Sequence, residues 1–453
     1  MTVAMAFGLV LGAIALLLAL VLGLRLPAFL ALLLTSVLVA LVGGIPAGEV
    51  AGEIQKAMGS TLGYIAVVIG LGAMLGEILH RSGGTQRIAR TLLATFGERR
   101  APLALGCTGI LVAIPVFFDV AFILFAPLLR TLSRRTGRSI LGFALPLLAG
   151  LAVAHAFIPP TPGPVAVAGL LGADLGWVIV LGLASGVPAL LVGGLLFGAY
   201  AARRVPVKAL DDDGAFEEDD EDIESAPPFG LALALLIFPL ALILFATTSK
   251  ILLPPEHGMS GPLQLLGHPF VALLLTTLLA GALLRRQQGW TAPELERLTT
   301  RALEPVASIL LLTGAGGVLG KVLLATGAGE VAAASLQESN LPLIALAFGL
   351  ALCVRIAQGS ATVSMVTSAG LVAPVAQAAS LSPAQLAALT LAIAAGATTC
   401  SHVNDSGFWL VSRYLGLTES QTLRTWTLLT TLVGLTGFLV VAGLFPLLPK
   451  GSP

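Results

Sequence analysis

The densest group of chemically active side chains lies between two apolar stretches, in the sequence T-C-S-H-V-N-D-S-G-F-W at residues 399–409. Five of six consecutive positions there are polar: Ser401, His402, Asn404, Asp405 and Ser406. Asn404 or Asp405 can cap a helix that begins near Gly407, but a cap requires only one such residue. The cluster therefore predicts a binding site for a polar solute, in which His402 and Asp405 are also candidates for carrying a proton.

A second polar group, R-I-A-Q-G-S-A-T-V-S at residues 355–364, has the composition of a tight turn between two helices. Gly359 permits the turn, and Ser360 and Thr362 offer hydroxyls at the start of the next helix. Arg355 can hold a substrate carboxylate with two parallel hydrogen bonds. Its alternative role is an internal ion pair, for which Asp119 is a candidate partner.

A third group, I-P-V-F-F-D at residues 114–119, places Asp119 in an apolar run. An ionisable side chain in such a run is costly to bury and is a functional candidate by default. Asp119 can carry a proton, pair with Arg355, or cap the helix that follows.

The fourth group, A-H-A-F-I-P-P-T-P-G-P at residues 154–164, cannot continue a helix because it contains four prolines in six residues. Thr161 is expected to cap a helix that restarts around Pro164, so that Gly163 and its neighbours present free N–H groups to an anion. His155 precedes the break and is either a proton-coupling residue or a structural histidine.

These four groups must be positioned by a membrane-embedded framework. The chain is 57% hydrophobic and only 11% charged, whereas about a quarter of the residues of a soluble chain are charged. Apolar runs of about 20 residues recur along its length, which predicts an all-α polytopic membrane protein surrounded by lipid. The zero net charge argues against nucleic acid as a partner. The three cysteines lie in apolar segments without metal-ligand spacing, so we expect no metal site and no disulfide.

The sequence contains an internal repeat. Residues 72–89 and 316–333 share Gly, Leu, Gly and Gly at the same four spacings, but arginines flank only the first copy. A duplicated membrane segment with positively charged flanks in only one copy is typical of two inverted-topology repeats. This architecture is common among secondary transporters.

Arginine-rich segments, which stay in the cytoplasm, give the topology. Two of them bracket residues 101–129, which are too few for two crossings with a turn and therefore predict a re-entrant hairpin. We expect about five spans in each half, with both termini outside and no cleavable signal, because the first apolar run is long enough to span. The predicted domains are a first repeat (1–202, with hairpin 101–129 and broken helix 139–172), an acidic cytoplasmic linker (203–227), and a second repeat (228–453, with hairpin 341–378 and broken helix 386–412).

The motifs G-A-M-L-G, S-G-G-T-Q-R-I-A, R-I-A-x-G-S-A-T-V and S-H-V-N-D-S-G-F-W, together with the proline-rich break, resemble those of the gluconate permease family. The resemblance implies a bacterial inner-membrane symporter that imports gluconate or a related sugar acid with protons. It also implies kinship with the ion-transporter superfamily, in which a hairpin domain moves against a scaffold in the elevator manner. This chain departs from the family in having Asp119 where Glu is common and Ser406 where Pro is usual. Relatives take idonate, fructuronate or D-serine, so several small monoanions remain candidates.

The sequence is also compatible with other functions. A sodium-coupled carboxylate transporter is the first alternative, because unwound backbone carbonyls near Gly359 and Ser406 can ligate sodium. An intramembrane hydrolase could use His402, Asp405 and a serine, but neither G-x-S-x-G nor H-E-x-x-H is present. We therefore expect no catalytic residues, no enzyme activity and no cofactor beyond the coupling proton. A homodimer is one possible assembly, although no residue in the sequence indicates one.

Overall fold

The computed structural model describes residues 3–114, 116–207, 225–253, 257–327 and 342–450. All the secondary structure within these ranges is helical. Eight helices are long and apolar enough to cross a membrane, which agrees with the predicted polytopic α-helical fold. The acidic segment at 208–224 and the segment at 328–341 lie outside the described residues, so the linker and the start of the second hairpin stay predictions.

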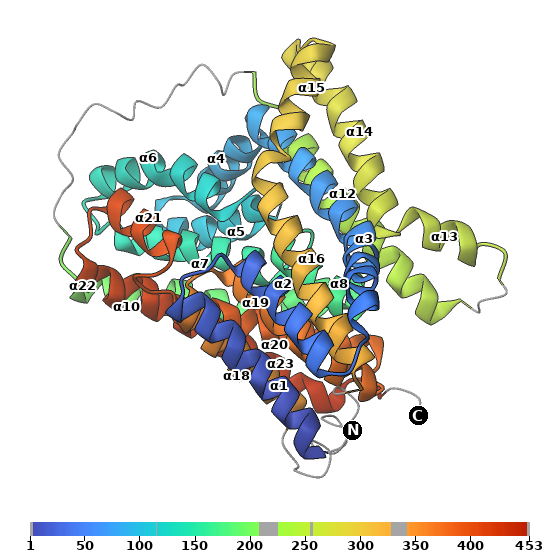
Figure 1. Ribbon diagram of the computed structural model, residues 1–453. Coiled ribbons are helices and arrows are strands. Elements are labelled where there is room, and N and C mark those ends of the chain that lie inside the picture. Colours follow the sequence, from blue (N-terminus) through green and yellow to red (C-terminus); the bar gives the residue numbers. More distant parts are fainter. Residues whose placement is uncertain (1–2, 115, 208–224, 254–256, 328–341, 451–453) are drawn as a thin grey trace.

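Seven of the helices that precede the two hairpin segments pack into one group, from which the α14–α15 turn projects (Figure 1). Their bounds are α1 (Val3–Leu18), α2 (Ala28–Val42), α3 (Ala47–Arg81), α12 (Phe229–Leu252), α14 (Pro269–Gln288), α15 (Ala292–Arg301) and α16 (Glu304–Ala325). Helix α3 packs against α16 and α14, and α16 also packs against α2. The two copies of the repeated glycine motif thus lie on the paired helices α3 and α16, since Gly72 and Gly76 belong to the first and Gly316 and Gly320 to the second.

Each predicted hairpin segment contains two helices joined at a short tip. Residues 101–129 form α5 (Ala101–Ala113) and most of α6 (Phe118–Thr136), and the second segment forms α18 (Leu343–Gln358) and α19 (Ala361–Ala378). Helix α5 packs along α7, and α18 packs along α20. These pairs approach closely because small residues face each other: a Cβ on Gly109 would lie 2.9 Å from the backbone nitrogen of Leu151.

Each predicted broken helix is interrupted at its polar cluster. The first consists of α7 (Leu141–Phe157) and α8 (Pro162–Leu171), and the second of α20 (Pro383–Thr398) and α21 (Ser406–Leu415). Helix α8 restarts at Pro162, two residues before the expected Pro164, because proline fits the first turn of a helix, where no N–H partner is needed.

A long final span follows each broken helix, and both spans contain a π-helical stretch. The first comprises α9 (Leu175–Ala189), η3 (Leu190–Leu196) and α10 (Phe197–Arg204); the second comprises α22 (Glu419–Thr422), η4 (Leu423–Thr427) and α23 (Leu428–Leu444). Helices α9 and α23 pack against each other and join the two halves. The short helices α4 (Gly84–Phe96) and α13 (Ser260–Leu266) complete the connections.

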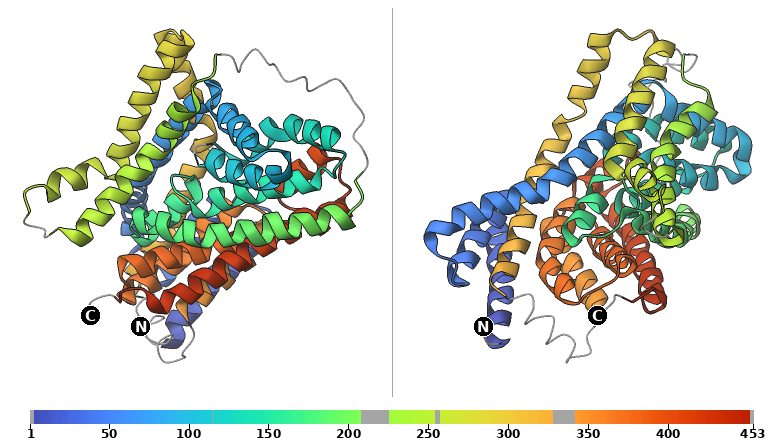
Figure 2. Two further views of the ribbon diagram at one scale, coloured as in Figure 1. Left: turned by 180° about the vertical axis from the view of Figure 1, so that it is seen from behind. Right: turned by 90° about the vertical axis from the view of Figure 1, so that its right-hand side faces the viewer.

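Two opposite ends of the molecule can be distinguished. The first turns of α1 and the end of α23 lie at one end, and the α14–α15 turn projects at the other (Figures 1 and 2). This turn belongs to the arginine-rich segment 285–301, which the charge rule assigns to the cytoplasm. The side of the membrane that each end faces, and the inverted relation of the halves, stay predictions.

Candidate solute-binding site

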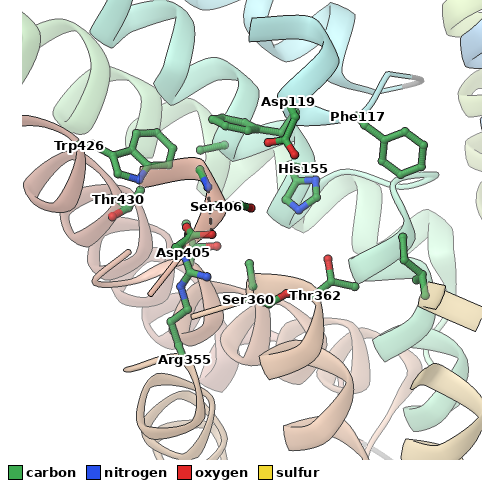
Figure 3. A pocket seen from close by; sticks show the side chains of 16 residues that line it. Phe117, Asp119, His155, Arg355, Ser360, Thr362, Asp405, Ser406, Trp426 and Thr430 are labelled. Atoms are coloured by element: carbon green, nitrogen blue, oxygen red, sulfur yellow. Dashed lines mark hydrogen bonds and ion pairs between the residues drawn. The ribbon is translucent and has the colours of Figure 1, made fainter. Parts of the chain in front are cut away.

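A cavity of about 240 Å³ lies where the hairpin tips and the second helix break meet. Its walls come from both halves of the chain: the start of α6, the end of α7, α16, the start of α19, the second break, and the final span around η4 (Figure 3). Seven of the thirteen residues expected at the site line it: Asp119, His155, Arg355, Ser360, Thr362, Asp405 and Ser406. The cavity has the size of a site for one small solute.

Three helices begin at this cavity. Ser360 is the N-cap of α19 and accepts a hydrogen bond from the backbone N–H of Val363 at 3.4 Å. Asp405 is the N-cap of α21 and accepts from the backbone N–H of Gly407 at 3.2 Å. Helix α6 begins beside them at Phe118. Since helix N-termini carry a partial positive charge and unpaired N–H groups, the cavity is suited to an anion.

Asp405 is also the centre of a buried polar network. Its Oδ2 atom accepts a hydrogen bond from Nη2 of Arg355 at 2.6 Å and a second one from the hydroxyl of Ser401. That hydroxyl in turn accepts from the indole N–H of Trp426 at 2.7 Å. The side chain of Arg355 is only 4% exposed, so its partner neutralises a charge that would otherwise be buried alone. The internal partner of Arg355 is therefore Asp405 and not Asp119, the partner named as a candidate from the sequence.

The same guanidinium fixes the tip of the second hairpin. Its Nη1 atom donates to the backbone carbonyl of Gly359, which ends α18 with a φ of +82°. A Cβ at this glycine would also lie 2.8 Å from Cγ of Asn404. Only glycine satisfies both the backbone conformation and this contact.

Asp119 has a different environment from Asp405. It is exposed to the cavity, and within the described ranges its carboxylate has neither a hydrogen bond nor an ion pair. The N-cap position of α6 is occupied by Phe117, so Asp119 does not cap this helix. Figure 3 shows its carboxylate on the same side of the cavity as His155, across from Ser360 and Asp405.

The start of α8 does not reach this cavity, contrary to expectation. Thr161 occupies the N-cap position, but its hydroxyl donates backwards to the carbonyls of Ile158 at 2.6 Å and Ala154 at 3.2 Å. It lines a separate void of about 20 Å³. Gly163 lies against α19, where a Cβ would come within 2.6 Å of the sulfur of Met365. This helix start thus packs against the second hairpin and adds no N–H groups to the cavity.

Three further expected residues lie outside the lining of the cavity. Ser401 is fully buried in the network around Asp405. Asn404 donates from its side-chain amide to the carbonyl of Ile356 at 2.9 Å and so ties the break to the hairpin. His402 has a buried Nδ1 atom without a hydrogen-bond partner in the described part of the chain.

Aromatic side chains that the sequence did not single out form one wall. The ring of Trp426 lies 5.3 Å from that of Phe118, and Phe118 lies 6.5 Å from His155. Phe117 and Thr430 also line the cavity. No local signal marks these residues, because aromatic and threonine side chains are ordinary in apolar helices. They can be assigned to the site only from the fold, which places η4 beside the second break.

The multi-pass helical fold and the solute-sized cavity, which charged and hydroxyl side chains help to line, define a membrane transport protein. A model of the GntP family permeases matches residues 5–448, and the chain belongs to this family. It is therefore a multi-pass inner-membrane permease and not an enzyme, as expected from the sequence.

The relatives span nearly the whole chain. The protein is 39% identical over 394 residues to a low-affinity gluconate transporter of Escherichia coli K12, covering 87% of this chain and 88% of that one. It is 40% identical over 393 residues to the inner membrane permease YgbN of the same organism, covering 84% and 86%. Among solved structures, MtrF of Neisseria gonorrhoeae superposes with a TM-score of 0.68 at 15% identity, covering 96% of this chain and 98% of that one. At this identity the likeness concerns the fold alone.

Proposed function

We propose that this permease imports gluconate or a closely related sugar acid together with protons. The observation that carries the proposal is the cavity, in which helix starts and hydroxyls surround a space for one small solute, combined with near-full-length similarity to a gluconate transporter. The carboxylate of the substrate would lie at the starts of α19 and α21, close to Ser360 and Ser406. Its hydroxyls would bond Thr362 and Thr430, and its carbon chain would lie along Phe118 and Trp426.

The charges of the cavity supply a reason for proton coupling. Arg355 is already neutralised by Asp405, so Asp119 and an anionic substrate would together bring two uncompensated negative charges into one small space. Two unit charges 4 Å apart interact by about 4 kcal/mol at an effective dielectric constant of about 20. A proton on Asp119 removes this repulsion. Binding of the anion and binding of the proton are then mutually favourable, which is what symport requires.

The test compares Asp119→Asn with the unchanged protein in proteoliposomes. Asparagine keeps the shape but is permanently neutral, so we expect exchange of internal for external gluconate to persist while accumulation driven by an inward proton gradient is lost. Proton-driven accumulation that survives in Asp119→Asn would remove this residue from the coupling scheme. Uptake that needs sodium in both proteins would replace proton coupling by the sodium-coupled alternative.

A further inference from the structure

A second cavity, of about 450 Å³, lies away from the candidate site, where the end of α6, the start of α7 and the end of α10 meet. Its lining includes the three arginines Arg130, Arg134 and Arg138 and the two hydroxyl residues Ser133 and Ser139. Among its described lining residues there is no Asp or Glu. This part of the chain is the arginine-rich segment 130–138, at the end of α6, which the charge rule assigns to the cytoplasmic surface.

Specific contacts hold this basic cavity in shape. Gly137, with a φ of +66°, turns the chain at the end of α6, and the hydroxyl of Ser133 donates to the carbonyl of Arg138 at 2.7 Å across this turn. Arg130 donates to the carbonyl of Tyr414 at 3.1 Å, which ties the cavity to α21. The buried hydroxyl of Ser139 has no hydrogen-bond partner in the described ranges. This hydroxyl has no accessible surface, so the polar groups that the cavity offers to a ligand are the arginine side chains.

An apolar cavity of about 270 Å³ adjoins the basic one and shares Arg138, Ser139 and Ala202 with it. Its remaining lining consists of the apolar residues Pro102, Phe143, Leu195 and Ala199, together with Gly142 and a second arginine, Arg203. The guanidinium of Arg138 lies 5.7 Å from the centre of the Phe143 ring and so marks the boundary between the two cavities. The adjacent helix surface carries Leu196, 68% exposed, and Tyr200, 60% exposed, as expected for a face in contact with lipid.

We infer that the basic cavity binds a phosphate group, and that this group belongs to an anionic phospholipid. Arginine forks match phosphate oxygens with paired hydrogen bonds, and basic pockets between membrane helices are suited to anionic lipid headgroups. A free phosphate ion would use only the basic cavity. The apolar cavity beside it fits the glycerol and first acyl carbons of a lipid, which is why a phospholipid is the better match.

The experiment measures lipid binding to the purified full-length protein, delipidated in a neutral detergent, by native mass spectrometry during titration with phosphatidylglycerol. We expect the Arg134→Gln, Arg138→Gln double variant to bind at least ten-fold more weakly than the unchanged protein. The matched control removes the same charge from α15, as Arg297→Gln with Arg301→Gln, and should bind normally. Each variant is first shown to be folded by its elution volume and melting temperature.

Two further arms separate the lipid from free phosphate. Ala199→Phe fills the apolar cavity, so it should weaken phosphatidylglycerol binding, and millimolar inorganic phosphate should compete poorly. Unchanged binding in Ala199→Phe, together with ready displacement by phosphate, would overturn the lipid assignment. Equal binding of phosphatidylglycerol to the double variant and its control would overturn the site itself.

Discussion

At the scale of single residues, the pair formed by Arg355 and Asp405 is the part of the site that is most sensitive to change. The two charges lie 2.6 Å apart with their side chains 4% and 13% exposed. Removing one partner leaves the other buried without compensation, a loss of about 3–5 kcal/mol. We therefore expect Arg355→Ala and Asp405→Ala each to abolish uptake and to lower the melting temperature in detergent.

A double-mutant cycle checks this interpretation. If the pair is structural, the variant carrying both substitutions should be more stable than the sum of the single losses predicts. Additive losses would contradict the assignment of these two residues as partners. The more exposed pair of Arg81 and Glu77, at 3.7 Å, is the control, because breaking a surface ion pair costs little.

Trp426 is predicted to position Asp405 through the hydroxyl of Ser401. Trp426→Phe removes the indole N–H but keeps an aromatic ring beside Phe118, so it deletes one hydrogen bond, which contributes about 0.5–1.5 kcal/mol. We expect a two- to ten-fold loss in kcat/KM for gluconate uptake, with the folded yield unchanged. Equal kinetics for the two proteins would show that this hydrogen bond does not position the site.

Sequence reasoning located the polar half of the cavity and missed the aromatic half. Asp405, Ser360 and Arg355 were found because polar residues inside apolar stretches are costly and therefore conspicuous. Trp426 and Phe118 were not, because their residue types carry no such signal. The partner of Arg355 required the fold, since two carboxylates were available and only the placement of α21 beside α18 selects Asp405.

At the scale of helices, the breaks determine the site. Prolines indicated the first broken helix, Gly359 indicated the second hairpin tip, and a cluster of polar side chains indicated the second broken helix, so the positions of the interruptions were predictable. The role of each capping residue was less predictable than the position of the break. A threonine hydroxyl can accept from the helix ahead or donate to the carbonyls behind, and Thr161 does the second. This choice depends on packing against α19, which the sequence of the break does not encode.

The hairpin tip gives a prediction at this scale. Gly359→Ala forces a side chain into the left-handed conformation, at a cost of about 1–2 kcal/mol, and into Asn404. We expect a strong loss of uptake and a lower melting temperature. Gly349→Ala on the same hairpin is the control, because its Cβ would meet no atom within 4 Å. If the two substitutions behave alike, the tip does not require glycine.

At the scale of the whole molecule, the cavity exists because the two halves meet. Asp119 and His155 come from the first half, whereas Arg355, Ser360 and Asp405 come from the second. The sequence indicated this arrangement through its internal repeat, and the helices of each half follow in a comparable order. The charge of the cavity therefore depends on both halves. Arg355 and Asp405 of the second half pair with each other, whereas Asp119 of the first half has no ion-pair partner among the described residues.

This charge balance leads to the most direct test of the proposed function. The measurement is uptake of radiolabelled gluconate into proteoliposomes under an inward proton gradient without sodium, with internal pH followed by a trapped dye. We expect accumulation against a gluconate gradient, simultaneous internal acidification, and loss of accumulation when a protonophore is added. Gluconate entry that only equilibrates, with no change in internal pH, would contradict the proposed function.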